Sequence, residues 1–200
     1  MARKGLAVGA AVVVVALLPT VSCSSRAPNE APPAGSAPTK VAPSTTATLN
    51  PDTSLERRIR LDHEAAVSAY RTALAEVDRL FIVGGATQPT NKLRKVATGN
   101  YLQFTMETLR ALKEDDLHGI GTTKVVFAAA QGSSGSTIHV KACEDITDAL
   151  ILDDDGKRQR LPDKRLFVQD YTVSRTREAW KVSDLTSKPV ASFDSYGCNK

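Results

Sequence analysis

The chain has few of the side chains that perform most enzymatic chemistry. Its 200 residues include three histidines and three cysteines. There is no Gly-x-Ser-x-Gly turn, no His-Glu-x-x-His helix, no Walker phosphate loop and no Cys-x-x-Cys pair. These absences argue against the common hydrolase, metalloprotease, nucleotide-hydrolysing and dithiol classes. The sequence therefore predicts no catalytic residue, no metal site and no cofactor.

Each histidine has an ordinary explanation. His63 lies between two acidic residues on a helix, as expected of a solvated face. His118 is expected at a helix C-terminus, where an imidazolium favours the helix dipole. His139 precedes Cys143 by four residues on a strand, a separation of ~13 Å that is too long for one shared metal ion.

The chain also lacks a strong charge of one sign. Its formal net charge is +4, and it falls to +2 if Arg3 and Lys4 are removed with a leader segment. Aromatic residues make up 5% of the sequence and do not alternate with a basic patch. The sequence therefore predicts no nucleic-acid binding.

No apolar run is long enough for a permanent membrane span. Arg3 and Lys4 precede the longest run, Leu6–Leu18, which has about 13 residues where a spanning helix needs about 20. Small residues then lead to Cys23. A basic start, a short apolar core and a small residue before a cut site predict an export signal over residues 1–22.

The end of this signal is more specific. Val21-Ser22-Cys23 resembles the bacterial lipoprotein signal, in which the cysteine receives a diacylglyceryl group and becomes the first residue, although Thr20 stands where Leu is usual. The alternative is an ordinary secretory signal. Lipidation of Cys23, with palmitate or another acyl chain, would anchor the protein to the outer, extracytoplasmic side of the cell membrane.

Cysteine parity supports lipidation. With Cys23 acylated, Cys143 and Cys198 remain as an even pair, which an oxidising compartment would join as a disulfide. That bond would fasten the C-terminal tail, residues 186–200, to a strand.

Domain organisation follows from composition. Residues 23–52 begin with the lipidated Cys23 and continue as a Pro-, Ser-, Thr- and Ala-rich stretch, which predicts a disordered tether. Glycosylation of this tether is left open. Residues 53–200 form the single predicted domain.

The first half of this domain is predicted to be helical. Thr53 or Ser54 begins a long helix that Gly84-Gly85 ends, a short helix covers Asn91–Ala97, and a third begins near Asn100. The long helix is expected to bury one apolar stripe, formed by Leu55, Ile59, Ala66, Tyr70, Ala73, Leu74, Val77, Leu80 and Phe81.

From Gly121 the apolar period changes to two, which indicates strands. The predicted strands are Thr123–Ala130, Ser136–Cys143, Ala149–Asp153, Lys164–Arg175 and Glu178–Asp184. Helices followed by consecutive strands predict an α+β fold, with the N-terminal helices packed on one face of a curved, cone-like antiparallel sheet. The order excludes a Rossmann fold or a (β/α) barrel.

The order of these features resembles the nuclear transport factor 2-like (NTF2-like), cystatin-cone superfamily, in particular its actinobacterial exported and lipoprotein members. The resemblance rests on Cys143-Glu144-Asp145, an Asp155-Gly156 turn, Trp180-Lys-Val182 and a late Gly197-Cys198, and covers about residues 55–198. Most such members have no assigned activity. Some members of the superfamily are isomerases, dehydratases or epoxide hydrolases that place Asp, His or Tyr inside the cone.

The resemblance implies a weak candidate pocket made of Tyr70, Tyr101, Asp170 and Tyr171. Asp170 lies mid-strand and would act as a base of raised pKa if it were buried, although an outward position is common on a half-exposed sheet. Strand alternation places Ile138, Val140 and Ala142 on one face and His139 on the other.

Three classes of function remain. The preferred one is a non-enzymatic envelope lipoprotein that binds a protein partner, as an accessory subunit or a surface-exclusion factor, with a homodimer through the sheet face left open. The alternatives are a carrier of a small apolar ligand in the cone and a cone-type lyase or isomerase. We prefer the binding role because the sequence has a predicted anchor, a tether and a disulfide pair but no recognisable set of catalytic residues.

Overall fold

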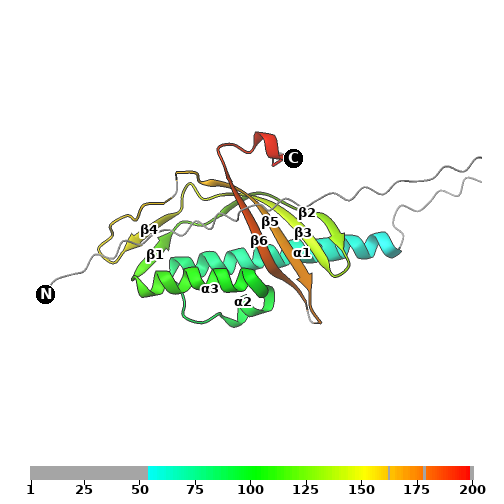
Figure 1. Cartoon of the computed structure of the whole chain (residues 1–200), viewed down its shortest axis with the longest axis horizontal. Helices are drawn as coiled ribbons and strands as arrows, with labels where there is room; N and C mark the ends of the chain where they lie inside the picture. The colour runs from blue at the N-terminus through cyan, green and yellow to red at the C-terminus, as the bar shows by residue number, and fades with distance from the viewer. Residues whose placement is uncertain (1–53, 162, 178, 199–200) are drawn as a thin grey trace, which may run out of the picture. The chain divides into compact units, whose positions relative to one another are not determined.

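Three helices precede six strands in the computed structural model, which describes residues 54–161, 163–177 and 179–198 (Figure 1). The predicted signal, Cys23 and the tether lie outside these residues. The elements are α1 (Ser54–Ile82), α2 (Asn91–Val96), α3 (Gly99–Glu114), β1 (Leu117–Ile120), β2 (Lys124–Ser134), β3 (Thr137–Asp145), β4 (Leu150–Asp153), β5 (Leu166–Arg175), β6 (Trp180–Val190) and the short 3-10 helix η1 (Asp194–Tyr196).

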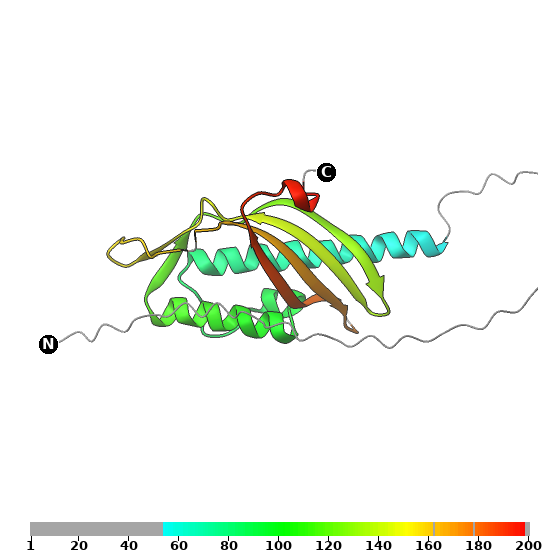
Figure 2. The same ribbon diagram turned by 45° about the horizontal axis from the view of Figure 1, so that its top comes forward.

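The long helix α1 buries the middle and end of its predicted stripe. Ala66, Tyr70 and Ala73 are among its fully covered side chains. The prediction was wrong for the first two turns, where Leu55 is 65% exposed and Ile59 43% exposed, because α1 extends past the end of the sheet (Figure 2). Within the described ranges, no helix is both long and apolar enough to cross a bilayer.

The shorter helices have local start signals. The Thr90 hydroxyl accepts a hydrogen bond from the Leu93 N–H and so caps α2. The Thr98 N–H donates to the Val182 carbonyl at 2.8 Å, which ties the start of α3 to β6. The first contact fixes the start of α2, and the second holds α3 against the sheet.

Four strands form one antiparallel sheet in the order β2-β3-β5-β6. The sheet curves over α1 and α3, so its concave face and the helices enclose the core (Figures 1 and 2). β1 and β4 pair separately at one end. The predicted α+β fold, with helices on one face of a curved antiparallel sheet, is confirmed.

The prediction missed β1. His118 does not end a helix: it lies in β1 opposite Leu152 of β4. Gly119 is likewise a strand residue, and a Cβ atom built there would lie 1.9 Å from the Phe81 ring of α1. Glycine therefore allows the close packing at 119, and the expectation that His118 lies at a helix C-terminus was wrong.

One predicted turn agrees with the structure and one predicted strand end does not. Asp153 and Gly156 close the predicted acidic turn, with the Gly156 N–H donating to the Asp153 carbonyl at 2.9 Å. Thr176 and Ala179 close the turn between β5 and β6. β6 continues beyond the predicted end at Asp184 as far as Val190, because its residues stay paired with β5.

The C-terminal segment packs on the sheet face opposite the helices (Figure 1). Cys143 and Cys198 form the predicted disulfide, which spans 55 residues of sequence. A loop of this length corresponds to about 4 kcal/mol of lost denatured-state entropy. The Lys141 ammonium donates to the Tyr196 carbonyl, and the Lys188 ammonium lies 5.0 Å from the Tyr196 ring centre. The tail is therefore fixed to the convex face by a covalent bond and two cationic contacts.

Candidate functional site

The alternation of β3 places one carboxylate inside the domain. Ile138, Val140 and Ala142 face the helices, as predicted, while His139 is exposed. Continuing the same alternation by two residues brings Glu144 to the concave face, where it is 4% exposed. Glu144 was not among the predicted pocket residues, although its position two residues after Ala142 was a signal that could have identified it.

Glu144 is surrounded by three donors from two elements, α1 and β5. The hydroxyls of Tyr70 on α1 and Tyr171 on β5 both donate to its Oε1, at 2.7 and 2.8 Å. The Gln169 Nε2 donates to its Oε2 at 3.3 Å. The acidic residue is therefore the centre of a buried cluster that joins α1, β3 and β5, called here the Glu144 cluster.

Burial dominates the electrostatics of this cluster. Removal from water raises the pKa of the Glu144 carboxyl, and the hydrogen bonds from Tyr70, Tyr171 and Gln169 oppose that rise. Burial, reinforced by the charge of Glu144, raises the pKa values of Tyr70 and Tyr171 above the ordinary value. Both phenols therefore stay protonated and act as donors.

The Gln169 amide nitrogen has a hydrogen-bond partner, whereas its amide oxygen has none among the described residues. This Oε1 is buried and has no hydrogen-bond partner within the described part of the chain. Rotating the amide by 180° would exchange its O and N positions and bring Oε1 to the Oε2 of Glu144. There it would accept a hydrogen bond from a protonated Glu144 carboxyl, the form that the raised pKa of Glu144 favours.

Three of the four predicted pocket residues come together and the fourth does not. The rings of Tyr70 and Tyr171 lie 4.6 Å apart between centres, and Tyr101 meets Tyr171 edge-on at 5.9 Å. Burial also raises the pKa of Tyr101. Asp170 is exposed on the other face of β5, because strand alternation turns it away from its neighbours Gln169 and Tyr171. The idea of Asp170 as a buried base was wrong.

A second buried carboxylate on α1 has a structural role. Glu76 is 2% exposed and accepts hydrogen bonds from both the Arg79 guanidinium and the Thr90 hydroxyl. The Arg79 hydrogen bond is the main cause of its pKa falling to about 2, with Thr90 and Lys92 adding to the effect against burial. Glu76 thus connects α1 to the start of α2.

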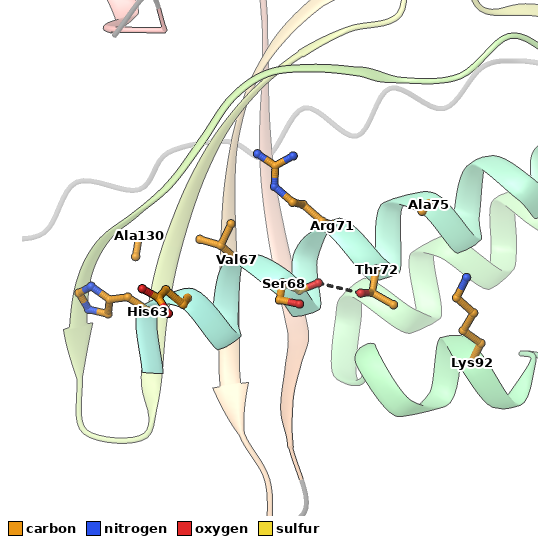
Figure 3. Close-up of a pocket in the computed structure, with 9 residues that line it drawn as sticks. His63, Val67, Ser68, Arg71, Thr72, Ala75, Lys92 and Ala130 are labelled. Carbon is orange, nitrogen blue, oxygen red and sulfur yellow. Dashed lines mark hydrogen bonds between the residues drawn. The ribbon is translucent and has the colours of Figure 1, made fainter. Parts of the chain in front are cut away.

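A groove lies on the outer side of α1 (Figure 3). It is lined by seven α1 residues between His63 and Ala75, by Lys92 of α2 and by Ala130 of β2. This hollow is called here the α1–β2 groove. His63, Val67 and Arg71 form a row along it, beside Ala130. Its walls include none of the residues of the Glu144 cluster, so the hollow and the buried carboxylate are separate features.

Metal binding has no support in the described ranges, where no three His, Cys, Asp or Glu side chains gather closely enough to hold an ion. His63 is half-buried rather than fully solvated, and its Nε2 has no hydrogen-bond partner in the described structure.

Comparison with known proteins gives similarity at the level of structure. No protein-family model and no curated protein matches the sequence. The intermembrane-space region of the chloroplast protein ARC6 matches with a TM-score of 0.48 and 13% identity, over 64% of this chain and 98% of its own. A candidate aromatic-ring hydroxylase from Novosphingobium aromaticivorans gives 0.45 and 14%, over 66% and 92%. A candidate dehydratase of the NTF2-like family from Streptomyces avermitilis gives 0.43 and 15%, over 66% and 99%.

At such scores and identities these matches carry no argument about activity, which has to come from the residues themselves. An NTF2-like protein with a cystatin-like fold from Novosphingobium aromaticivorans is a further match, with a TM-score of 0.39 and 15% identity over 73% of this chain and 95% of its own. The structural neighbours of this chain thus include proteins described as NTF2-like and as having a cystatin-like fold.

Proposed function

We propose that this chain is a non-enzymatic binding module of the cell envelope. In this proposal Cys23 is acylated and holds the chain to the outer side of the cytoplasmic membrane, and residues 23–52 connect that anchor to a domain that recognises a protein partner. An accessory subunit and a surface-exclusion factor are the two roles that fit this arrangement.

One observation supports a surface rather than an interior function. The Glu144 cluster is closed by its own side chains: Tyr70 is 1% exposed, Tyr171 2% and Glu144 4%. Both carboxylate oxygens already accept hydrogen bonds from these neighbours. A substrate would have to displace packed tyrosines to reach the carboxylate, whereas the α1–β2 groove is open to a partner as it stands.

Native mass spectrometry of the protein extracted from its own envelope tests this function. We expect an acylated Cys23 and a second polypeptide bound to the chain, with the acyl mass absent in Cys23→Ser. An unmodified Cys23 would refute the anchoring, and a chain that retains a small molecule without a protein partner would refute the binding role.

A cone-type lyase or isomerase is the second candidate. Its support is the raised pKa of Glu144 beside two phenol donors, a combination suited to general acid chemistry. This candidate requires α1 to move so that a substrate can enter. It predicts that the extracted chain carries a small molecule and that Glu144→Gln, which keeps the side-chain shape, loses it.

A further inference from the structure

The outer edge of β2 is unpaired among the described strands. β2 is the first strand of the sheet order, and no described strand pairs with its other side. Irregular register interrupts its ladder at Val125/Phe127 and again at Ala130/Gly132. Between these points, residues 127–130 pair regularly with β3. An unpaired edge offers backbone donors and acceptors to an incoming strand, and bulges restrict such pairing to the regular part.

One side of α1 runs alongside this edge of β2. Thr123, just before β2, donates hydrogen bonds to Asp78 through its N–H at 3.0 Å and its hydroxyl at 2.9 Å. Seven residues further along the chain, Ala130 lines the groove with His63 and Val67 (Figure 3). β2 therefore runs along α1 in the opposite direction, and the space between them is bordered by a strand edge and a helix side.

The spacing along α1 fits an extended segment. His63, Val67 and Arg71 succeed one another every four residues, or about 6 Å along the helix. Alternate side chains of a strand repeat at about 6.6 Å. An extended segment lying along the β2 edge can therefore present three alternate side chains to these three residues in turn.

The chemistry of the row specifies those side chains. Arg71 is exposed and has no ion-pair partner among the described residues. Val67 is half-buried and apolar, and the Nε2 atom of His63 is buried, so the groove presents the side of the His63 ring and not a free nitrogen. Lys92, further along the groove, adds a second positive charge, because the Glu76 carboxylate it approaches at 3.5 Å is already bound by Arg79 at 2.7 Å.

We propose that the α1–β2 groove is the docking surface for an extended segment of a protein partner, which adds to the edge of β2 and places an acidic side chain on Arg71. An apolar side chain meets Val67 two residues away, and a third side chain packs on the His63 ring two residues beyond that. Strand addition supplies affinity through the backbone, and the three side chains supply specificity. This inference rests on the proposed function, because it names the kind of partner and the place where it binds.

Selection of random ten-residue peptides displayed on phage tests this surface, with the chain purified from its own envelope as the target. We expect enriched peptides to be rich in β-branched residues and to share an acidic position. We also expect Arg71→Glu to weaken their binding at least about tenfold, since a charge pair becomes a charge repulsion. Arg58→Glu is the matched control: it makes the same charge change on an exposed part of α1 outside the groove and should bind as the unchanged chain does.

Amide hydrogen exchange locates the bound peptide. Protection should appear at residues 127–130, because their edge amides would gain partners. Absence of enrichment, enriched peptides without an acidic position, equal binding to Arg71→Glu, or unchanged exchange over 127–130 would each overturn the inference. A dimer of this chain that dissociates in Arg71→Glu would overturn it too, since the surface would then belong to a second copy.

The two proposals fail separately. A partner that co-purifies equally well with the unchanged chain and with Arg71→Glu leaves the binding module intact and removes only the docking surface. A chain without acylated Cys23 or a protein partner removes the proposed function, whatever the peptides do.

Discussion

The Glu144 cluster and the α1–β2 groove place polar side chains in opposite settings. Inside, Glu144 has three donors around it and almost no exposed surface. Outside, Arg71 is exposed and lacks an ion-pair partner in the described residues. Leaving a buried polar group unpaired costs free energy, so most buried polar groups are bonded within their own chain. An exposed one can keep its bonding capacity for another molecule. The interior cluster is therefore expected to control stability and the groove to control binding.

The largest effect is expected from deleting the buried carboxylate. Glu144→Ala should lower the free energy of unfolding by about 3–6 kcal/mol, because the Tyr70 and Tyr171 hydroxyls each lose their acceptor at about 1–3 kcal/mol and a cavity remains. Urea denaturation measures the change. Asp170→Ala, on the exposed face of the adjacent strand, is the control, with an expected change within about 0.5 kcal/mol. Equal losses of unfolding free energy in Glu144→Ala and Asp170→Ala would show that the buried cluster does not stabilise the fold more than an exposed residue does.

Removing single phenol donors should have a smaller effect. Tyr70→Phe and Tyr171→Phe should each lower the free energy of unfolding by about 1–3 kcal/mol and raise the pKa of Glu144 further, because each removes a hydrogen bond that favours the ionised form. Carbon-13 NMR of the labelled carboxyl measures that pKa. Tyr101→Phe is the control, since its hydroxyl donates no bond to Glu144. If all three variants gave the same pKa, the donor roles of Tyr70 and Tyr171 would be wrong.

The pH dependence of stability should distinguish the two buried carboxylates. The folded-state pKa of Glu144 is raised above its ordinary 4.5, so the folded chain holds this proton more tightly than the unfolded chain. Its contribution is present below pH 4.5 and is lost as pH rises through the folded-state value. The pKa of Glu76 is lowered to about 2, so its contribution is present above pH 4.5 and is lost as pH falls toward 2.

Unfolding free energies measured from pH 2 to pH 8 test these opposite signs. Glu144→Gln should remove the loss of stability at rising pH, and Glu76→Gln should remove the loss at falling pH. A Glu144→Gln profile parallel to that of the unchanged chain would show that the carboxyl of Glu144 does not titrate differently in the folded state.

The smallest effect on stability is expected from the groove. Arg71→Glu and Arg58→Glu should each change the free energy of unfolding by less than about 0.5 kcal/mol, because both side chains are exposed. Thermal or urea unfolding gives the comparison. A loss of several kcal/mol in Arg71→Glu would mean that Arg71 supports the fold, and the binding interpretation of the groove would lose its basis.

Local signals in the sequence account for the helices, most strands and the position of the disulfide. Gly84-Gly85 ends α1 because both residues adopt positive φ, and the change to a period of two marks the start of the sheet. β1 was not predicted because it has only four residues, one of them the closely packed Gly119, and so short a segment shows no clear alternation of apolar and polar side chains. Its existence depends on pairing with β4, about thirty residues later.

The candidate site was only partly predictable. Tyr70, Tyr101 and Tyr171 were predicted pocket residues and do come together. Asp170 was also predicted but faces away, and the central Glu144 was not predicted. The apolar neighbours of Asp170 suggested burial, whereas the direction of a strand side chain depends on which face the helices cover. Glu144 continues the inward series of Ile138, Val140 and Ala142 at steps of two. That pattern was sufficient to predict that its side chain faces the helices.

The sequence by itself determined the order of α1–α3 and β2–β6, the cysteine pair and the later part of the stripe that α1 buries, because each depends on residues close together in the chain or on parity. Only the tertiary structure decided that Tyr70, Glu144 and Tyr171 meet, because these residues lie 74 and 27 positions apart and reach one another through the curvature of the sheet. It also decided that the edge of β2 lies beside His63, Val67 and Arg71. That arrangement depends on how a helix and a strand pack, which no local pattern encodes.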